Sequence, residues 1–191
     1  LWEKMFRVDM GMKKQGAAAY ALSALDIGLW DIVGKTLEKP LYKLWGATRH
    51  RIPCYGSGGW AKYGVDDLVR EAEKYAAQGC RYYKMKIHDP DPKANRARVE
   101  AVKRAVGSGV RLMVDANCAY DTLTALQIGR LLEAQGVAWF EEPVAPELLD
   151  GYVKLARALD MPIAGGETEF TRWAFKEILA RQAMDIIQPD I

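Results

Sequence analysis

The chain has 191 residues, half of them hydrophobic, and a formal net charge of +2. This length suits one large domain or a domain and a half. Basic residues alternate with acidic ones, so the sequence predicts neither nucleic-acid binding nor a polybasic membrane surface. No uninterrupted apolar run reaches the roughly 18 residues that cross a bilayer, and the first residues lack a signal-peptide pattern. We therefore expect a cytoplasmic protein.

Both ends of the sequence and its cysteines set further expectations. The first residue is Leu1, and the chain stops one residue after Pro189-Asp190, so we expect an internal portion of a longer chain. Cys54, Cys80 and Cys118 are odd in number and widely spaced, which fits neither a zinc site nor a disulfide framework. We expect reduced thiols in or near the core.

The predicted elements change character after residue 50. Residues 1–50 contain an Ala-rich helix from Gln15 to Gly34 and a short helical turn from Leu41 to Trp45. From residue 51 onward, strands and helices alternate. The strands are predicted at 51–57, 81–87, 110–114, 137–140, 162–164 and 185–188, and the intervening helices at 65–78, 92–106, 122–134, 146–159 and 171–181.

Regular β-then-α alternation predicts an α/β fold with a parallel sheet and right-handed crossovers. We expect residues 51–191 to form a partial (β/α) barrel of the TIM type, with about six of the eight units of a closed barrel. An open, doubly wound sheet is the alternative fold. It would place the ligand at one switch point and would not explain acidic residues at the ends of three adjacent strands.

Three acidic residues recur at equal intervals, each after a short apolar run. They are Asp115, Glu141 and Glu167, and both intervals are 26 residues (115 to 141 and 141 to 167). One βα unit consumes about that much chain, so the spacing puts the carboxylates at the carboxyl ends of three consecutive strands. Carboxylates that converge repel one another unless a hard cation lies between them. The spacing therefore predicts a Mg²⁺ site.

Two lysines lie on the preceding predicted strand. Lys84 and Lys86 are separated by one residue, so both side chains face the barrel mouth while Met85 faces the helices. Neighbouring ammonium groups disfavour each other's protonation, so we expect the pKa of at least one to fall toward neutrality. Such a lysine can act as a general base near pH 7. A pair of surface lysines at a strand end is the structural alternative.

Other polar residues follow the same strand ends. Asn117 can donate to a substrate oxygen or can cap a helix or a loop. Ser57, in a loop whose glycines allow close approach, is a second candidate for substrate binding. Glu142 faces away from Glu141 by strand alternation, so we expect it to support the site, for example by pairing with a lysine. Asp190 could orient a histidine or lysine of the next strand, or cap the following helix.

Five ordered motifs together resemble the enolase superfamily, specifically its mandelate racemase subgroup. They are Lys84-Met85-Lys86, Val114-Asp115-Ala116-Asn117, Phe140-Glu141-Glu142-Pro143, Gly166-Glu167 and Gln188-Pro189-Asp190. The segment from Ala24 to Tyr42 also looks like the helix that precedes the barrel in that family. On this resemblance, residues 1–50 are the end of an amino-terminal capping region.

The resemblance implies a role for each matching residue. Asp115, Glu141 and Glu167 would bind one Mg²⁺ per subunit, and the superfamily uses a Lys or His base with such a metal. Lys86 would remove the proton α to a carboxylate, with Lys84 tuning it and stabilising the enolate. Asp190 would be the orienting half of a His-Asp dyad. The dyad histidine would lie on a seventh strand, and neither His50 nor the loop residue His88 replaces it.

The resemblance further implies dehydration of an acid sugar to a 2-keto-3-deoxy acid. Racemisation or epimerisation of a 2-hydroxy acid is the nearest alternative on the same scaffold. Two other classes stay open: a Schiff-base lyase that uses Lys84 or Lys86 as nucleophile, and a non-catalytic barrel fragment. We expect a small carboxylate substrate, a homo-oligomer, and no nucleic-acid or membrane partner.

Overall fold

The computed structural model describes residues 1–8 and 16–190, which divide into two compact units. Unit 1 comprises Leu1–Pro53 together with Phe170–Phe175. Unit 2 comprises Cys54–Glu169 and Lys176–Asp190. The expected division into functional domains after residue 50 stays a prediction.

Unit 1 is helical. It contains α1 (Trp2–Val8), α2 (Ala17–Thr36) and α3 (Leu41–Leu44). Helix α1 was not expected from the sequence, and the stacked rings of Trp2 and Phe6, with centroids 4.6 Å apart, support it through an i,i+4 contact. The predicted start of α2 at Gln15 lies outside the described residues. The helix continues past Gly34 to Thr36, because the amide of Leu37 still donates to the carbonyl of Val33.

Helix α2 is long and apolar enough to cross a membrane, judged by length and composition alone. Its mean hydropathy reaches 1.3, and 6% of this segment is buried. The sequence argument missed it because that argument counted uninterrupted apolar residues, and Asp26 and Asp31 interrupt the run. Helices that never enter a bilayer can meet the same criteria, so this observation is weak evidence for a membrane span.

Unit 2 is built on one parallel sheet whose strand order follows the sequence. The strands are β1 (Gly56–Ser57), β2 (Tyr82–Lys86), β3 (Arg111–Asp115), β4 (Phe140–Glu141), β5 (Ile163–Gly165) and β6 (Ile186–Ile187). A doubly wound sheet reverses its strand order at a switch point, whereas this order runs from β1 to β6 without reversal. The barrel prediction is therefore confirmed as a six-stranded partial barrel.

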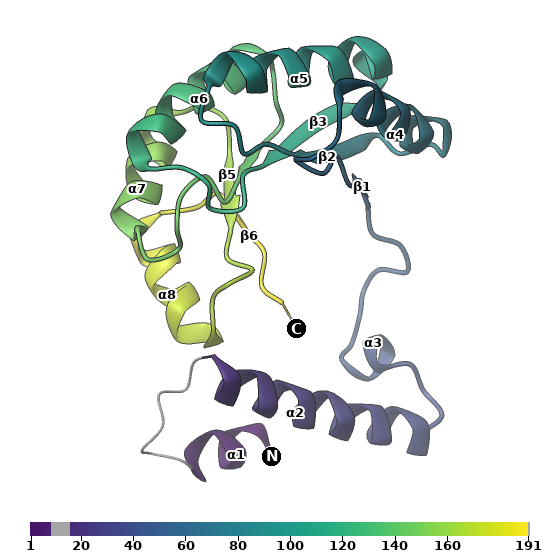
Figure 1. Cartoon of the computed structure of the whole chain (residues 1–191). Helices are drawn as coiled ribbons and strands as arrows, with labels where there is room; N and C mark the ends of the chain where they lie inside the picture. Colours follow the sequence, from purple (N-terminus) through teal and green to yellow (C-terminus); the bar gives the residue numbers. More distant parts are fainter. Residues whose placement is uncertain (9–15, 191) are drawn as a thin grey trace. The chain divides into compact units, whose positions relative to one another are not determined.

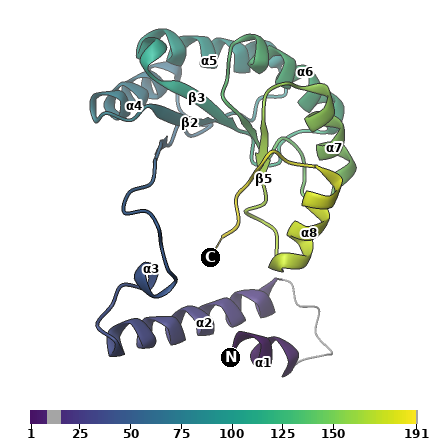
Figure 2. The same ribbon diagram turned by 180° about the vertical axis from the view of Figure 1, so that it is seen from behind.

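Five helices connect these strands. They are α4 (Val65–Ala77), α5 (Pro92–Val106), α6 (Thr122–Ala134), α7 (Leu149–Ala158) and α8 (Thr171–Arg181). Figure 1 shows α4 to α7 forming an outer layer around the strands, and Figure 2 shows the same layer from behind. Sequence chemistry explains the starts of two helices. Asp91 caps α5 ahead of Pro92, and Asp121 caps α6 by accepting from the amides of Leu123 and Thr124.

The core of unit 2 lies between the sheet and this helical layer. Buried helix residues pack against buried strand residues: Leu68, Ala72, Val99, Val102, Ile128, Leu132 and Leu155 from the helices, and Tyr83, Met85, Leu112, Val114, Phe140 and Ile163 from the strands. Met85 is fully buried, as alternation on β2 predicts. Lys84 and Lys86 lie on the opposite face of β2.

Most strands are shorter than the apolar runs that predicted them. The first strand was expected at 51–57, but only Gly56–Ser57 pairs with β2. Beyond it, Gly58 donates to the carbonyl of Lys84 and the carbonyl of Gly59 accepts from the amide of Lys86. All three cysteines are free, as expected, although Cys54 is exposed and does not belong to the core.

Candidate active site

One row of aligned residues crosses three neighbouring strands. Lys86 on β2 is paired in register with Asp115 on β3, and Asp115 is paired with Glu141 on β4. Side chains aligned across neighbouring strands lie on the same face of a sheet. The row therefore brings a lysine and two carboxylates together at the carboxyl end of the sheet.

Both lysines contact these carboxylates. The Nζ atom of Lys86 lies 3.0 Å from Oδ2 of Asp115. The Nζ atom of Lys84 lies 3.5 Å from the same oxygen and donates to Oε1 of Glu141. Asp115 and Glu141 are 1% and 0% exposed, so water does not screen their contacts with the lysines. The prediction that Lys84 and Lys86 face the same way is confirmed, and a pair of surface lysines is excluded for Lys84, which is 8% exposed.

The environment of Lys84 raises its pKa. Burial alone would lower the pKa of this ammonium, but the hydrogen bond to Glu141 and the charges of Glu141 and Asp115 outweigh burial. The expectation was that the pKa of at least one lysine of the pair falls, and Lys84 is not that lysine. The expectation considered only the neighbouring ammonium and not the carboxylates of the next two strands.

Asn117 supports Asp115 and Lys86. Its backbone amide donates to Oδ1 of Asp115 at 2.9 Å, and its side-chain oxygen accepts from the Nζ atom of Lys86. Asn117 and Cys118 have φ values of 42° and 62°, so the chain turns sharply after β3. Asn enters this left-handed region more readily than most residues. Asn117 therefore shapes the loop after β3 and accepts from Lys86, and its predicted contact with substrate stays a prediction.

Glu142 is buried beside the row. It is 2% exposed, and burial together with the charges of Glu167 and Asp115 raises its pKa to about 7. Within the described ranges, the ion pairs of Lys84 and Lys86 go to Asp115 and Glu141 instead. The expectation of a lysine partner for Glu142 is therefore wrong.

Glu167 lies beyond the row. The partner of Glu141 on β5 is Ala164, so Glu167 follows three residues later, in an exposed turn after Gly166. Burial and the charges of Asp115 and Glu141 nevertheless raise the pKa of Glu167. The three carboxylates are therefore close enough to repel one another.

This donor set suits a divalent cation. No three acidic, histidine or cysteine side chains among residues 1–8 and 16–190 already stand in metal-binding geometry. Carboxylate oxygens are nevertheless the hard ligands that Mg²⁺ prefers, and a bound Mg²⁺ would offset the repulsion between these three carboxylates. The ammonium of Lys84 lies against both Asp115 and Glu141. The site thus already holds positive charge at these oxygens.

The remaining predicted residues lie around this row. Ser57 is aligned with Lys84 and is exposed, while its carbonyl accepts from the hydroxyl of Tyr75 at 3.1 Å. Asp190 is exposed and follows the end of β6 by three residues. His50 and His88 are both exposed, and His88 lies in the loop after β2. The roles of Ser57 and Asp190 stay predictions.

Three aromatic residues that contact Glu141 or the lysines were not identified from the sequence. The Nε1 atom of Trp139 donates to Oε2 of Glu141 at 3.0 Å. The Nζ atoms of Lys84 and Lys86 lie 5.7 Å and 5.6 Å from the ring centroids of Tyr55 and Trp60. Strand alternation could have indicated Trp139, because it precedes Glu141 by two residues and so shares its face.

Hydrogen bonds fix both ends of the loop that carries Trp60. The carboxylate of Glu71 accepts from the amide of Gly59 and, at 2.7 Å, from the hydroxyl of Tyr83. The guanidinium of Arg98 donates to the carbonyl of Tyr63 at 2.7 Å and to that of Trp60 at 3.4 Å. These contacts hold the loop beside the lysine strand.

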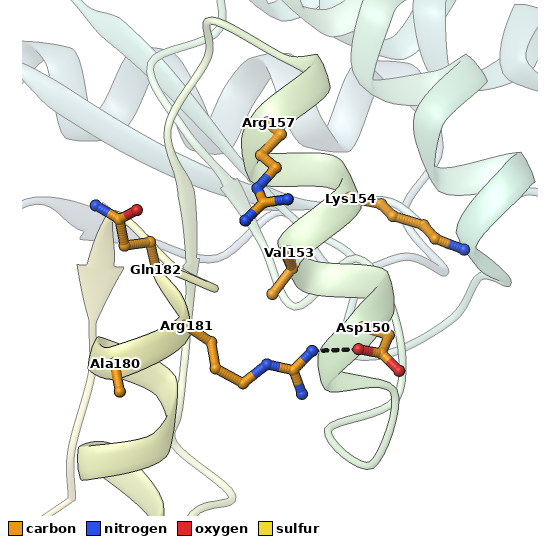
Figure 3. A pocket seen from close by; sticks show the side chains of 7 residues that line it. All are labelled: Asp150, Val153, Lys154, Arg157, Ala180, Arg181 and Gln182. Atoms are coloured by element: carbon orange, nitrogen blue, oxygen red, sulfur yellow. Dashed lines mark hydrogen bonds and ion pairs between the residues drawn. The ribbon is translucent and has the colours of Figure 1, made fainter.

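A separate pocket of about 470 Å³ lies in the outer helical layer, between α7 and α8. Figure 3 shows its lining: Asp150, Val153, Lys154, Arg157, Ala180, Arg181 and Gln182. Arg181 points toward Asp150 and forms an ion pair with it (Figure 3). None of these residues belongs to a strand or follows a strand end, so this pocket is not the candidate active site.

Comparison with known proteins identifies the family. Residues 67–191 match the family described as enolase C-terminal domain-like, and residues 1–46 match the mandelate racemase / muconate lactonizing enzyme N-terminal domain. The chain belongs to the enolase superfamily, in its mandelate racemase subgroup. The predicted family is confirmed.

Individual relatives agree with this assignment. The whole chain is 38% identical to arabinonate dehydratase from Saccharolobus solfataricus and covers 52% of it. It is 34% identical to D-galactarolactone cycloisomerase from Agrobacterium fabrum, again over the whole chain and 51% of the relative. The crystal structure of L-talarate dehydratase from Polaromonas sp. JS666, complexed with Mg and L-glucarate, matches with a TM-score of 0.92 at 33% identity. That match covers 99% of this chain and 53% of the dehydratase. The chain thus spans about half the length of these relatives.

Proposed function

We propose that this chain is the metal- and lysine-bearing part of an acid-sugar dehydratase. The observation that carries the proposal is the row of Lys86, Asp115 and Glu141, with Lys84 bonded between the two carboxylates. Such a row combines a proton acceptor, a fixed positive charge and anionic oxygen ligands. These are the groups that removal of a proton α to a carboxylate requires.

Asp115, Glu141 and Glu167 would hold one Mg²⁺ per subunit. Bound there, Mg²⁺ supplies the Lewis acidity that stabilises negative charge on the substrate carboxylate. Support comes from the mutual repulsion of the three carboxylates and from the magnesium in the crystal structure of L-talarate dehydratase. Because Lys84 and Lys86 contact the same oxygens, both ammonium groups must give up some of these contacts when the carboxylates bind a cation.

Lys86 is the proposed base. It is the more exposed of the pair, with 17% of its side chain accessible against 10% for Lys84. In its neutral form its nitrogen takes the α proton as the C–H bond breaks, and the electron pair is delocalised into the carboxylate as an enediolate. Lys84, bonded to buried Glu141, remains a cation and stabilises that charge.

Expulsion of the β-hydroxyl completes dehydration. The enediolate re-forms its carbonyl, the β C–O bond breaks, and a proton delivered to the departing oxygen gives water. The resulting enol tautomerises to a 2-keto-3-deoxy acid. Asp190 would orient the histidine that supplies this proton, as the family resemblance implies. Substrate contacts are assigned to Asn117 and Ser57, which lie on the same sheet edge as Lys86 and Lys84.

A cycloisomerase is the second candidate, because relatives of similar identity carry that name. Both reactions begin with loss of an α proton, so the geometry of Lys86 suits either. Racemisation is a third outcome of the same step. Mass spectrometry of the product separates dehydration from the other two, since only dehydration removes one water, whereas cycloisomerisation and racemisation give isomers of the substrate.

The experiment uses the full-length protein with a panel of acid sugars that includes arabinonate, talarate and galactarate. In deuterated water we expect Mg²⁺-dependent exchange of the α proton and formation of a 2-keto product. Lys86→Met should abolish exchange and leave metal binding intact, whereas Lys74→Met, the same change on the exposed face of α4, should alter neither. Exchange at the normal rate in Lys86→Met would refute the assignment of the base.

A second measurement tests the metal site. Crystals soaked in Mn²⁺ should show an anomalous peak within about 2.0 to 2.5 Å of oxygens from Asp115, Glu141 and Glu167. A peak elsewhere, or no peak, would refute the ligand assignment. Borohydride trapping of substrate on a lysine, without a metal requirement, would instead support the Schiff-base lyase.

A further inference from the structure

Trp139 makes a directional contact with a fully buried carboxylate. Its indole Nε1 donates to Oε2 of Glu141 at 3.0 Å, and Glu141 is 0% exposed. The other oxygen of Glu141, Oε1, accepts from the ammonium of Lys84. The two contacts therefore fix the orientation of the carboxylate and give its oxygens different partners.

The indole ring is itself held in place. The ring of Tyr55 meets it edge-on, with centroids 5.6 Å apart and an interplanar angle of 85°. The same Tyr55 ring lies 5.7 Å from the Nζ atom of Lys84. Tyr55, Lys84, Trp139 and Glu141 thus form a closed set of contacts, which we call the Trp139 cluster. It joins the segment before β1 to β2 and β4.

We propose that Trp139 is a positioning residue that holds the Glu141 carboxylate ready for a divalent cation. The inference rests on the proposed function, since it concerns one of the three proposed metal ligands. An indole N–H cannot accept a proton or coordinate a cation, so its only polar action is to donate to Oε2. That donation leaves Oε1, now opposite Lys84, as the oxygen that a cation can share.

Hydrogen bonds to a metal ligand have a measurable effect on metal binding. Removing such a partner commonly weakens metal affinity about 10- to 100-fold, because the ligand is no longer held in the bound orientation. A tryptophan that served only as packing would lower the stability of the fold and leave the affinity of the folded protein unchanged. The two roles therefore predict different results.

The test replaces the indole nitrogen alone in the full-length protein. Benzothienylalanine at position 139, introduced by nonsense suppression, keeps the ring shape and exchanges the N–H group for sulfur. Trp139→Phe is the simpler companion variant. The dissociation constant for Mn²⁺ is measured by titration calorimetry, and the melting temperature is measured without metal. Trp45→Phe, a loss of one tryptophan in unit 1, is the control.

We expect Mn²⁺ affinity to fall at least tenfold in the benzothienyl protein, with little change in its metal-free melting temperature. Trp139→Phe should lose at least as much affinity, and Trp45→Phe should lose none. Affinity within twofold of the wild type, or a benzothienyl protein that unfolds, would overturn the inference. The proposed function has its own test in Glu141→Gln. If the wild-type protein and Glu141→Gln bind Mn²⁺ equally well, or if neither binds it, the proposed function is refuted instead.

Discussion

Gly59 lies where the loop after β1 meets the lysine strand, and replacing it with alanine should be costly. Its φ is +63°, a region that residues with a Cβ atom rarely adopt. A Cβ atom at this position would lie 2.5 Å from Cβ and 2.8 Å from Cα of Met85. Met85 is fully buried, so the backbone of β2 has no space into which it can move.

The two effects add to a large destabilisation. The left-handed backbone costs about 1 to 2 kcal/mol for a residue with a Cβ atom. Overpacking in a well-filled core costs about 1 to 3 kcal/mol. We therefore expect Gly59→Ala to lower the free energy of unfolding by roughly 2 to 5 kcal/mol. The carbonyl of Gly59 accepts from the amide of Lys86, so displacement of this loop also disturbs the proposed base.

Urea unfolding, followed by circular dichroism on the full-length protein, measures this cost. Gly79→Ala is the matched control, because Gly79 has a φ of +86° and no atom within 4 Å of a built Cβ. It should show the backbone cost alone, about 1 to 2 kcal/mol. If the two variants differ by less than about 0.5 kcal/mol, within the usual scatter between independent sites, the steric argument at Met85 is wrong.

Three further predictions concern a loop, a helix cap and the proposed role of Asp190. Arg98→Ala removes the donor to the carbonyls of Tyr63 and Trp60. The free energy of unfolding should fall by about 1 to 2 kcal/mol, and proteolysis of residues 58–64 should become faster. An unchanged rate of proteolysis would contradict this. The hydroxyl and amide of Thr124 donate to Asp121 and hold its pKa below the ordinary value. This stabilisation is present above the unfolded-state pKa of Asp121 and is lost as pH falls through the lower folded-state pKa. Asp121→Asn should therefore lower the melting temperature at pH 7, and the melting temperature of the variant should fall less below about pH 4. A difference between the two proteins that does not change with pH would contradict this. Asp190→Asn should slow dehydration severely while exchange driven by Lys86 survives in part, and equal loss of both rates would argue against separate roles for the two residues.

The sequence was sufficient to predict the architecture of unit 2, because the patterns that predict its strands and helices each extend over only a few neighbouring residues. The alternation of apolar runs with amphipathic segments predicted each strand and each α-helix from residue 56 onward, and missed only the short 3-10 helix Gly107–Gly109. Helices 92–106, 122–134 and 171–181 match their predicted bounds because Asp-Pro, Asp-Thr and apolar periodicity act within a few residues. Alternation on β2 likewise predicted that Lys84 and Lys86 share a face and that Met85 is buried.

Only the tertiary structure decided which groups touch. The equal intervals of 26 residues suggested three equivalent carboxylates, yet strand register places Lys86, Asp115 and Glu141 in one row and leaves Glu167 three residues beyond it. The raised pKa of Lys84 and the indole bond from Trp139 to Glu141 also depend on strand pairing. Register depends on where each loop returns the chain to the sheet, and the charge state of a buried lysine depends on its neighbours in space. Neither is a property of sequence separation.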